Sequence, residues 1–144
     1  LSSSSAASDV YKRQAVIPLM KEKKDGLIIN VSSWSGNHVS LLSGVSYTSS
    51  KHALNAMTET INMKYCNLGI RATALCPGEV ATPILDKRPK KLSTEQKNKM
   101  LKPDDLGQTI VFLCQMPKHV CINELTISPT WHRRYIADLG IEEL

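Results

Sequence analysis

Apolar residues follow two patterns along the chain, short continuous runs and longer stretches with helical spacing. Residues 27–31 and 70–76 are short runs rich in aliphatic side chains, typical of strands buried on both faces of a sheet. Between them, residues 46–68 carry apolar side chains at steps of three and four, and Gly69 follows as a helix stop signal. A strand, a helix and a second strand in this order predict a βαβ unit with a right-handed crossover.

The pattern predicts further elements on both sides of this unit. Residues 15–22 are typical of the end of a helix, although Pro18 is unfavourable inside one. Residues 121–127 have the pattern of a third strand. Pro103 and the acidic residues behind it predict the start of a helix. We expect the buried face of that helix to consist of Leu106, Ile110, Leu113 and Cys114. The fold class is therefore α/β, part of a doubly wound parallel sheet with helices on both faces.

The residues after the first two strands fall at the same edge of the predicted sheet. Ser32 and Ser33 follow the first strand, and residues 77–82 follow the second, where open parallel sheets bind ligands. Residues 84–101 are polar and lysine-rich, and their sequence around residues 93–96 predicts a short helix with a capping box. Such a segment is either a lid over that edge or a plain surface excursion.

Composition limits the class of protein. A chain of 144 residues with 42% hydrophobic side chains can form one globular unit with a modest core. It has no apolar run of about 18 residues, so we expect no transmembrane helix. The four cysteines lack the spacing of a metal site, and Cys66, Cys76 and Cys114 fall in apolar periodic segments. This pattern favours reduced core thiols in a cytoplasmic protein.

The positive charge is not concentrated. The net charge of +5 is spread over residues 21–24, 87–102 and 133–134, with acidic residues scattered throughout the chain. A nucleic-acid site would need a concentrated basic stripe with a reading element. We therefore expect solvated loops and helix faces, with neither a nucleic acid nor a membrane as a partner.

The first fourteen residues differ from the rest of the chain. A low-complexity run of serine and alanine is followed at residues 9–14 by Asp-Val-Tyr-Lys-Arg-Gln. This hexapeptide looks like a translation of the transposon-end adapter used to build sequencing libraries, and the stretch lacks the apolar core of a signal peptide. We expect residues 1–14 to be non-native and disordered, and residues 15–144 to be the natural part of the chain.

Tyr47 and Lys51 form the pattern with the clearest chemistry. They are four residues apart, so they lie one above the other on the predicted helix. A free phenol has a pKa of about 10, and a nearby ammonium group lowers that pKa toward neutral pH. Tyr47 falls nearly on the apolar stripe of the helix, and a lysine close to that stripe needs a partner. With a serine hydroxyl brought in from the first strand, this pair predicts proton transfer at a carbonyl or an alcohol.

Four short matches in the right order make the chain resemble the short-chain dehydrogenase/reductase family. They are residues 26–33, the YxxxK pattern at 47–51, residues 77–82 and residues 102–105. The resemblance covers almost everything from residue 15 to about residue 129 and corresponds to the C-terminal half of a family member. It implies a partial Rossmann-type sheet, the C-terminal half of a single domain. It also implies an oxidoreductase that uses NAD or NADP to interconvert a carbonyl and an alcohol.

The resemblance further implies roles for single residues. Tyr47 would be the general acid/base, and Lys51 would lower its pKa and hydrogen-bond the nicotinamide ribose. Ser33 would orient the substrate oxygen. Its spacing to Tyr47 is one residue longer than the family's commonest, so Ser32 or Ser35 could take its place.

The loop after the second strand would bind the cofactor together with Tyr47 and Lys51. Its implied cofactor-binding residues are Pro77, Gly78, Val80 and Thr82. Pro77 and Gly78 would shape the wall beside the nicotinamide, and Thr82 would hold the carboxamide. We expect no metal at this site.

Two family features are missing from the sequence, the glycine-rich phosphate loop and the asparagine of the proton relay. Both would lie upstream of residue 15, as would the residue that separates NAD from NADP. We therefore expect this chain to be an inactive fragment of a longer, active enzyme.

Two other classes of function stay open at this stage. One is a nucleotide-binding regulator that keeps the fold without turnover, although an intact Tyr47–Lys51 pair argues against it. The other is a sugar-nucleotide epimerase or dehydratase, which shares the YxxxK pattern but needs a larger substrate domain. The small side chains of Ala53, Ala56 and Thr60 on the long helix would suit packing in a homo-oligomer.

Overall fold

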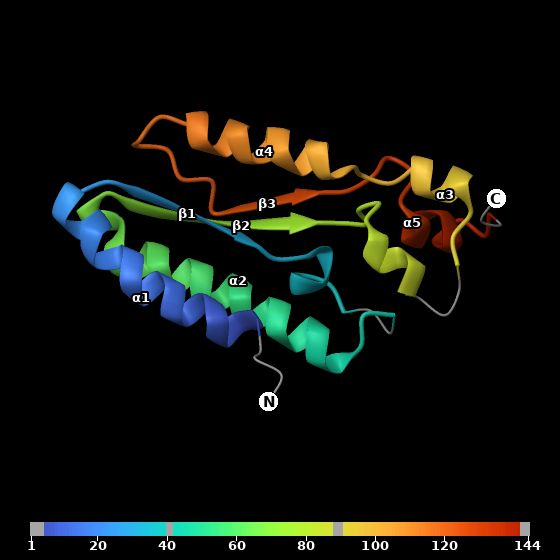
Figure 1. The fold of residues 1–144 in the computed structure, drawn as a ribbon, viewed down its shortest axis with the longest axis horizontal. Helices are drawn as coiled ribbons and strands as arrows, with labels where there is room; N and C mark the ends of the chain where they lie inside the picture. Colours follow the sequence, from blue (N-terminus) through green and yellow to red (C-terminus); the bar gives the residue numbers. More distant parts are fainter. Residues whose placement is uncertain (1–4, 40–41, 88–90, 142–144) are drawn as a thin grey trace.

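The computed structural model describes residues 5–39, 42–87 and 91–141, and its centre is a parallel three-stranded sheet. The strands are β1 (Gly26–Val31), β2 (Ile70–Pro77) and β3 (Glu124–Ile127), in the spatial order β1-β2-β3 (Figure 1). Both strand pairs are parallel. The expected α/β class with three parallel strands is confirmed.

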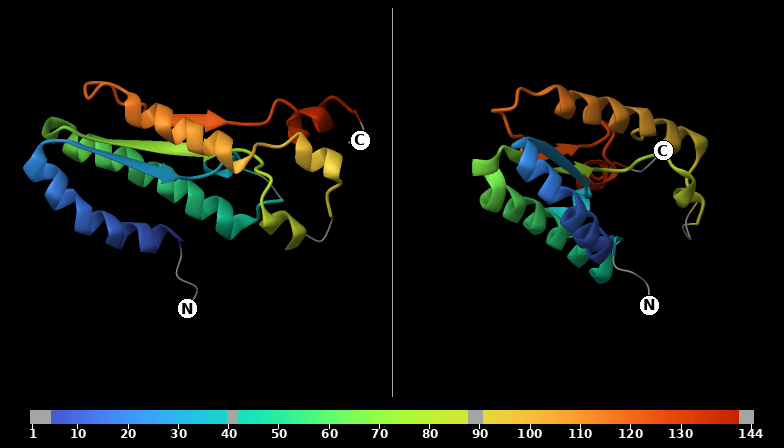
Figure 2. Two further views of the ribbon diagram at one scale, coloured as in Figure 1. Left: turned by 45° about the horizontal axis from the view of Figure 1, so that its top comes forward. Right: turned by 60° about the vertical axis from the view of Figure 1, so that its left-hand side comes forward.

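Helices cover both faces of the sheet, as the sequence predicts. Helices α1 (Ser5–Lys23) and α2 (Val45–Tyr65) lie on one face, and α4 (Pro103–Gln115) lies on the other (Figures 1 and 2). The shorter helices are α3 (Thr94–Asn98), α5 (Arg133–Asp138), η1 (Trp34–Gly36), η2 (Cys66–Leu68) and η3 (Pro83–Lys87). The capping box at Ser93 and the Pro103 helix start are both present.

The core lies between the sheet and the α1–α2 layer. Ile61 of α2 is buried with Ile70 and Ala72 of β2, and Ile17 and Met20 of α1 pack against them. Helix α2 ends through η2 at Gly69, whose φ of 72° is the left-handed conformation that glycine adopts without strain. A Cβ at Gly69 would also collide with the backbone of Lys24.

Helix α1 begins earlier than the sequence analysis predicts. It runs from Ser5, so it includes residues 5–14, which we expected to be disordered; residues 1–4 lie outside the described part. No glycine or proline interrupts the chain between Ser5 and Pro18, and alanine and long charged side chains favour helix. Disorder is thus the wrong expectation for residues 5–14, while their non-native origin stays a prediction.

Strand β3 is shorter than the predicted stretch of residues 121–127, and Asn62 explains why. The amide of Asn62 donates to the carbonyl of Ala72 at 2.8 Å and accepts from the Ala72 N–H at 2.6 Å. This side chain therefore satisfies the backbone of β2 at the level where β3 would otherwise pair. Pairing starts further along, where the Ala74 N–H donates to Asn123 at 2.9 Å.

Cysteine positions correct one of our expectations. Cys76 in β2 is fully buried, and burial raises the pKa of its thiol. Cys66 and Cys114, which we expected in the core, are exposed, as is Cys121, and all four are free thiols. Cys66 directly follows the last turn of α2, and Cys114 lies on the outer side of α4, so neither faces the sheet.

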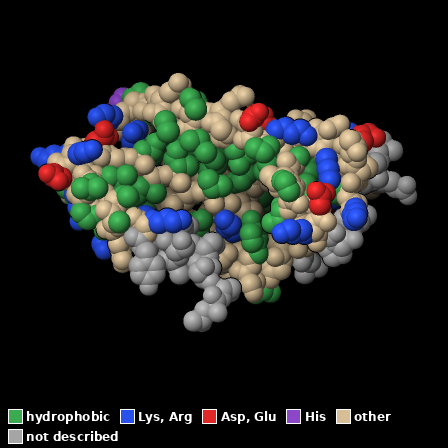
Figure 3. Space-filling view, viewed as in Figure 1, with side chains coloured by type: hydrophobic (Ala, Val, Ile, Leu, Met, Phe, Trp, Pro, Cys, Tyr) green, Lys and Arg blue, Asp and Glu red, His purple; other side chains and the backbone are tan. Residues whose placement is uncertain are grey.

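Figure 3 shows hydrophobic side chains gathered in the middle of one face of the molecule, with lysine and arginine around them. Exposed hydrophobic residues of β1 and α4 include Val31, Val111 and Phe112. Within the described residues, no helix has both the length and the apolar character needed to cross a membrane.

We predict that Asn62→Ala lowers the free energy of unfolding by about 1–3 kcal/mol, because both backbone groups of Ala72 lose this partner. Urea unfolding measures the change. Asn67→Ala is the matched control, since Asn67 is exposed in η2 and should change stability by less than about 0.5 kcal/mol. Equal effects of the two substitutions would contradict the role of Asn62.

We also predict that three thiols react quickly with a thiol reagent in the native chain and that the fourth reacts only after unfolding. Cys76 is the slow thiol because it is buried in the sheet. A Cys76→Ala variant should show three reactive thiols both before and after denaturation. Four fast thiols in the folded wild-type chain would show that β2 is not protected.

Candidate functional site

The candidate site lies where β1 and β2 end side by side. Val31, the last residue of β1, is in register with Leu75, and the Ser32 N–H donates to the Leu75 carbonyl at 2.7 Å. The segments that follow, with Ser33 after β1 and Gly78 after β2, therefore leave the sheet at the same edge. This arrangement matches the prediction from the sequence.

Ser33 begins the turn that follows β1. It is the N-cap of η1, and its hydroxyl oxygen accepts a hydrogen bond from the Ser35 N–H at 3.1 Å. The Ser33 side chain is 9% exposed. Because the hydroxyl accepts in this bond, its own proton is still able to donate to another oxygen.

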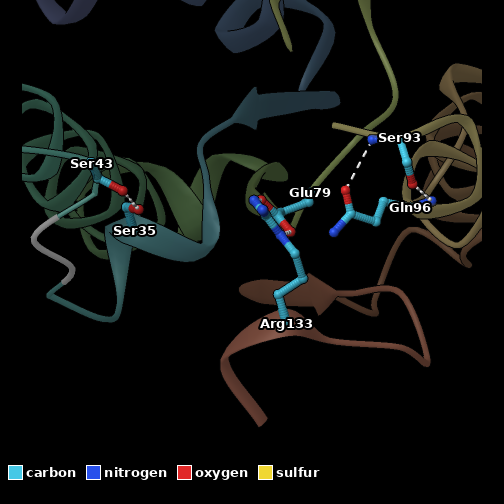
Figure 4. Close-up of polar contacts among 6 residues, drawn as sticks. All are labelled: Ser35, Ser43, Glu79, Ser93, Gln96 and Arg133. Carbon is cyan, nitrogen blue, oxygen red and sulfur yellow. Dashed lines mark hydrogen bonds and ion pairs between the residues drawn. The ribbon is translucent and has the colours of Figure 1, made fainter. Parts of the chain in front are cut away.

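The two alternative serines have their hydroxyls engaged in structural contacts. Ser32 donates to the carbonyl of Lys51 at 3.3 Å, which ties the end of β1 to α2. The hydroxyls of Ser35 and Ser43 are 2.7 Å apart and join η1 to the segment before α2 (Figure 4). Among the three serines, Ser33 is the one whose hydroxyl accepts a hydrogen bond from a backbone N–H.

Gly36 allows η1 to lie directly against α2. A Cβ at this position would come within 2.7 Å of the Ser32 hydroxyl and 2.8 Å of the Asn55 amide nitrogen. Asn55 itself donates to the side chain of Asn37 at 2.7 Å. Helix η1 is thus held on α2 just after Ser33, and the sequence analysis did not single out Gly36 or Asn55.

Tyr47 and Lys51 lie on the same side of α2, near the end of β1. The Lys51 ammonium donates to the carbonyl of Val31 at 3.1 Å and is 5.7 Å from the centre of the Tyr47 ring. Val31 is therefore the partner that a lysine close to the apolar stripe requires.

The exposure of Tyr47 differs from what its place on the apolar stripe suggests. Its side chain is 46% exposed. Asn30 pairs with Thr58 and Val31 with Lys51, so α2 runs back along β1 from the carboxyl end of that strand. Tyr47, one turn before Lys51, therefore extends beyond the sheet, and within the described part of the chain no strand covers its face of the helix.

The residues after β2 are fixed mainly by backbone contacts. The Gly78 N–H donates to Ile127 at 2.7 Å, and a Cβ on Gly78 would come within 3.2 Å of Ser128. The open side of Gly78 therefore faces the end of β3, which is a structural reason for a glycine here. Val80 forms an isolated parallel bridge with Leu101.

Thr82 lies at the end of the loop after β2, directly before η3 and the segment of residues 84–101. The carbonyl of Thr82 accepts from the Leu85 N–H at 3.0 Å, where η3 begins. Leu85 and Met100 are buried, so they anchor both ends of the segment at 84–101, of which residues 88–90 lie outside the described part. Between these two anchors, most of the described residues are exposed.

Residues near the C-terminus also reach this edge, and the sequence analysis did not find them. Trp34 stacks on His38 at a ring distance of 4.3 Å and packs on His132 at 4.5 Å. Arg133 makes a bidentate ion pair with Glu79 (Figure 4). No periodicity or spacing connects positions so far apart in the chain, so only the fold brings them together.

Burial affects the acid–base behaviour of His132. Its side chain is 7% exposed, and burial is the main cause that lowers the pKa of this histidine. The negative charge of Glu79 opposes that change, while Arg133, Arg134 and His38 reinforce it. Among the described residues, no group of three His, Cys, Asp or Glu side chains could hold a metal ion.

Comparisons with known proteins show which family this chain resembles. The family model of the short chain dehydrogenases matches residues 6–93, more than half of the chain. An uncharacterized oxidoreductase of Staphylococcus aureus (strain USA300) is 31% identical over 120 residues, which are 83% of this chain and 49% of that protein.

Solved structures show the same fold. A betaketoacyl-[ACP] reductase from Bacteroides thetaiotaomicron is similar with a TM-score of 0.67 and 32% identity, over 85% of this chain and 49% of that one. An alcohol dehydrogenase from the archaeon Thermococcus sibiricus, complexed with 5-hydroxy-NADP, has a TM-score of 0.69 and 26% identity, over 84% and 48%. The chain thus spans about half the length of the relatives it matches. With the family model matched over most of its length, the chain belongs to the short-chain dehydrogenase family.

Proposed function

We propose that the full-length protein is an NAD- or NADP-dependent oxidoreductase that interconverts a carbonyl and an alcohol on a small molecule. The observation that carries this proposal is the exposed Tyr47 phenol next to Lys51, at the carboxyl edge of a parallel sheet. A buried tyrosine in a core could not reach a substrate, whereas this one extends beyond the strands.

In the proposed reaction, Tyr47 acts as the general acid and base. During reduction its hydroxyl gives a proton to the carbonyl oxygen, and during oxidation the phenolate takes the proton from the alcohol. Lys51 holds its ammonium group 5.7 Å from the centre of the Tyr47 ring, on the same side of the helix. Ser33 donates its hydroxyl proton to the same substrate oxygen and holds it in place. The nicotinamide, when bound, supplies or accepts the hydride.

The residues present fit one end of a dinucleotide. Lys51 has three N–H donors and uses one on Val31, so it retains capacity for a ribose hydroxyl. Pro77, Gly78, Val80 and Thr82 would line the nicotinamide end. The sequence holds no glycine-rich phosphate loop. We therefore assign to this chain the nicotinamide end of the site, with the alcohol dehydrogenase bound to 5-hydroxy-NADP as support for the cofactor class.

We also propose a location in the cytoplasm and a homo-oligomeric state for the full-length protein. Four free thiols favour a reducing compartment such as the cytoplasm.

Three small residues on α2, Ala53, Ala56 and Thr60, are exposed. Their small side chains would let a second copy pack closely in a homo-oligomer.

We predict that Tyr47→Phe in the full-length protein lowers kcat by about 10²–10⁴-fold while the cofactor Kd stays within a few-fold, since only the proton donor is removed. The control is Tyr65→Phe, which makes the same change on the same helix and should leave kcat unchanged. Steady-state turnover and cofactor titration provide the readouts. A nucleotide-binding regulator would show no turnover to lose, and unchanged kcat in Tyr47→Phe would remove Tyr47 from the mechanism.

The 144-residue chain alone should show no measurable turnover with NAD or NADP, because it lacks a phosphate loop to hold the cofactor. The measurement is absorbance of the reduced nicotinamide with a panel of small aldehydes, ketones and alcohols. The full-length protein serves as the positive control. Turnover by the chain alone would contradict the idea that an upstream part is required.

A further inference from the structure

Three consecutive residues near the C-terminus each contact a different segment at the candidate site. Trp131 lies under the Lys99 ammonium at 4.4 Å, His132 packs on Trp34 of η1, and Arg133 pairs with Glu79. We call residues 131–135 the C-terminal latch. It joins the turn after β1, the loop after β2 and the segment around α3, which are otherwise separated along the chain.

The Arg133–Glu79 pair is the contact of these three that is made by hydrogen bonds. Two hydrogen bonds join the guanidinium to the carboxylate, and the side chains are only 18% and 21% exposed. Bidentate pairs of this kind fix orientation as well as distance. The Glu79 carbonyl also accepts from the Leu101 N–H at 3.1 Å. Arg133 therefore holds the loop of residues 78–82. Through the Glu79 backbone it also holds Leu101, shortly after the end of α3.

His132 acts in the same way on the turn after β1. Its ring lies 4.5 Å from Trp34 and 4.3 Å from Tyr135, and its side chain is buried. Trp34 directly follows Ser33, so packing on Trp34 limits the motion of the Ser33 turn. Aromatic contacts of this geometry contribute beyond their buried area.

The latch packs closely where it meets α3. The cavity between Glu79, Gln96, Met100, Trp131 and Arg133 has room for about one water molecule. Gln96 is also part of the capping box of α3 (Figure 4). Movement of the latch would therefore disturb the start of α3 and the loop after β2 together.

We propose that the C-terminal latch is a positioning element, in which Arg133 and His132 hold the loop after β2 and the Ser33 turn in fixed relation to each other. Its effect on the reaction rests on the proposed function, since those two segments carry the implied cofactor and substrate contacts. Fixing both before binding avoids an ordering cost when the reactants meet.

The structural part is tested by hydrogen exchange on this chain. Arg133→Met should speed exchange by about tenfold or more at residues 78–82 and 94–101, and His132→Ala should do so at residues 34–38. Amides of β2 should keep their rates in both variants. Arg134→Met, which changes the exposed neighbouring arginine, is the matched control and should alter neither segment. Unchanged exchange in the named segments of Arg133→Met and His132→Ala would overturn the proposal.

Glu79→Gln is a second test of the same ion pair, for use if Arg133→Met does not fold. It keeps the shape of the side chain and removes only the charge, and it should speed exchange in the same two segments as Arg133→Met. If Glu79→Gln leaves both segments protected, the ion pair does not hold the loop.

The catalytic part is tested in the full-length protein. Arg133→Met should lower kcat about tenfold and raise the cofactor Kd with little change in Tm, and the reversed pair Glu79→Arg with Arg133→Glu should restore part of both. A wild-type protein without turnover would refute the proposed function. The exchange results would still show whether the latch holds the loop after β2 and the Ser33 turn. An active protein in which Arg133→Met leaves kcat and Kd unchanged would refute the positioning role.

Discussion

Two hydrogen bonds run in opposite directions between Lys51 and the end of β1, and the candidate site depends on them. The Lys51 ammonium donates to the carbonyl of Val31 at 3.1 Å, while the Ser32 hydroxyl donates to the carbonyl of Lys51 at 3.3 Å. A helix joined to a strand in this way can neither slide along it nor rotate freely. Together with the Asn30–Thr58 hydrogen bond, this junction sets the direction of α2 along β1 and so the position of Tyr47 beyond the sheet.

Local patterns were sufficient to predict the sheet, its three strands and the main helices. Buried parallel strands need continuous apolar runs, and Pro103 and Gly69 are local signals that act within one turn. Patterns could not predict where β3 begins, because Asn62 on a distant helix occupies the backbone of Ala72. Likewise, helical spacing placed Tyr47 near the apolar stripe, but whether a strand lies opposite depends on strand length.

The C-terminal contacts mark a second limit of sequence reasoning. Arg133 and Glu79 are ordinary charged residues in polar segments, and nothing in either segment names the other as a partner. Only the parallel order of the strands, which returns the chain beside β2 after α4, brings them within reach. Sequence patterns could therefore nominate candidate proton-transfer residues, which lie in regular elements, but not the contacts of Arg133 and Glu79, which depend on the fold.

The outer edge of β1 has a consequence for handling this chain in solution. Among the described residues β1 pairs only with β2, and hydrophobic side chains of β1 and α4 are exposed on the same molecule. An open strand edge offers a row of backbone donors and acceptors to any neighbouring chain. At high protein concentration we expect copies of the chain to pair along this edge and aggregate. A polypeptide that supplied the neighbouring strand would cover the edge and keep the chain in solution.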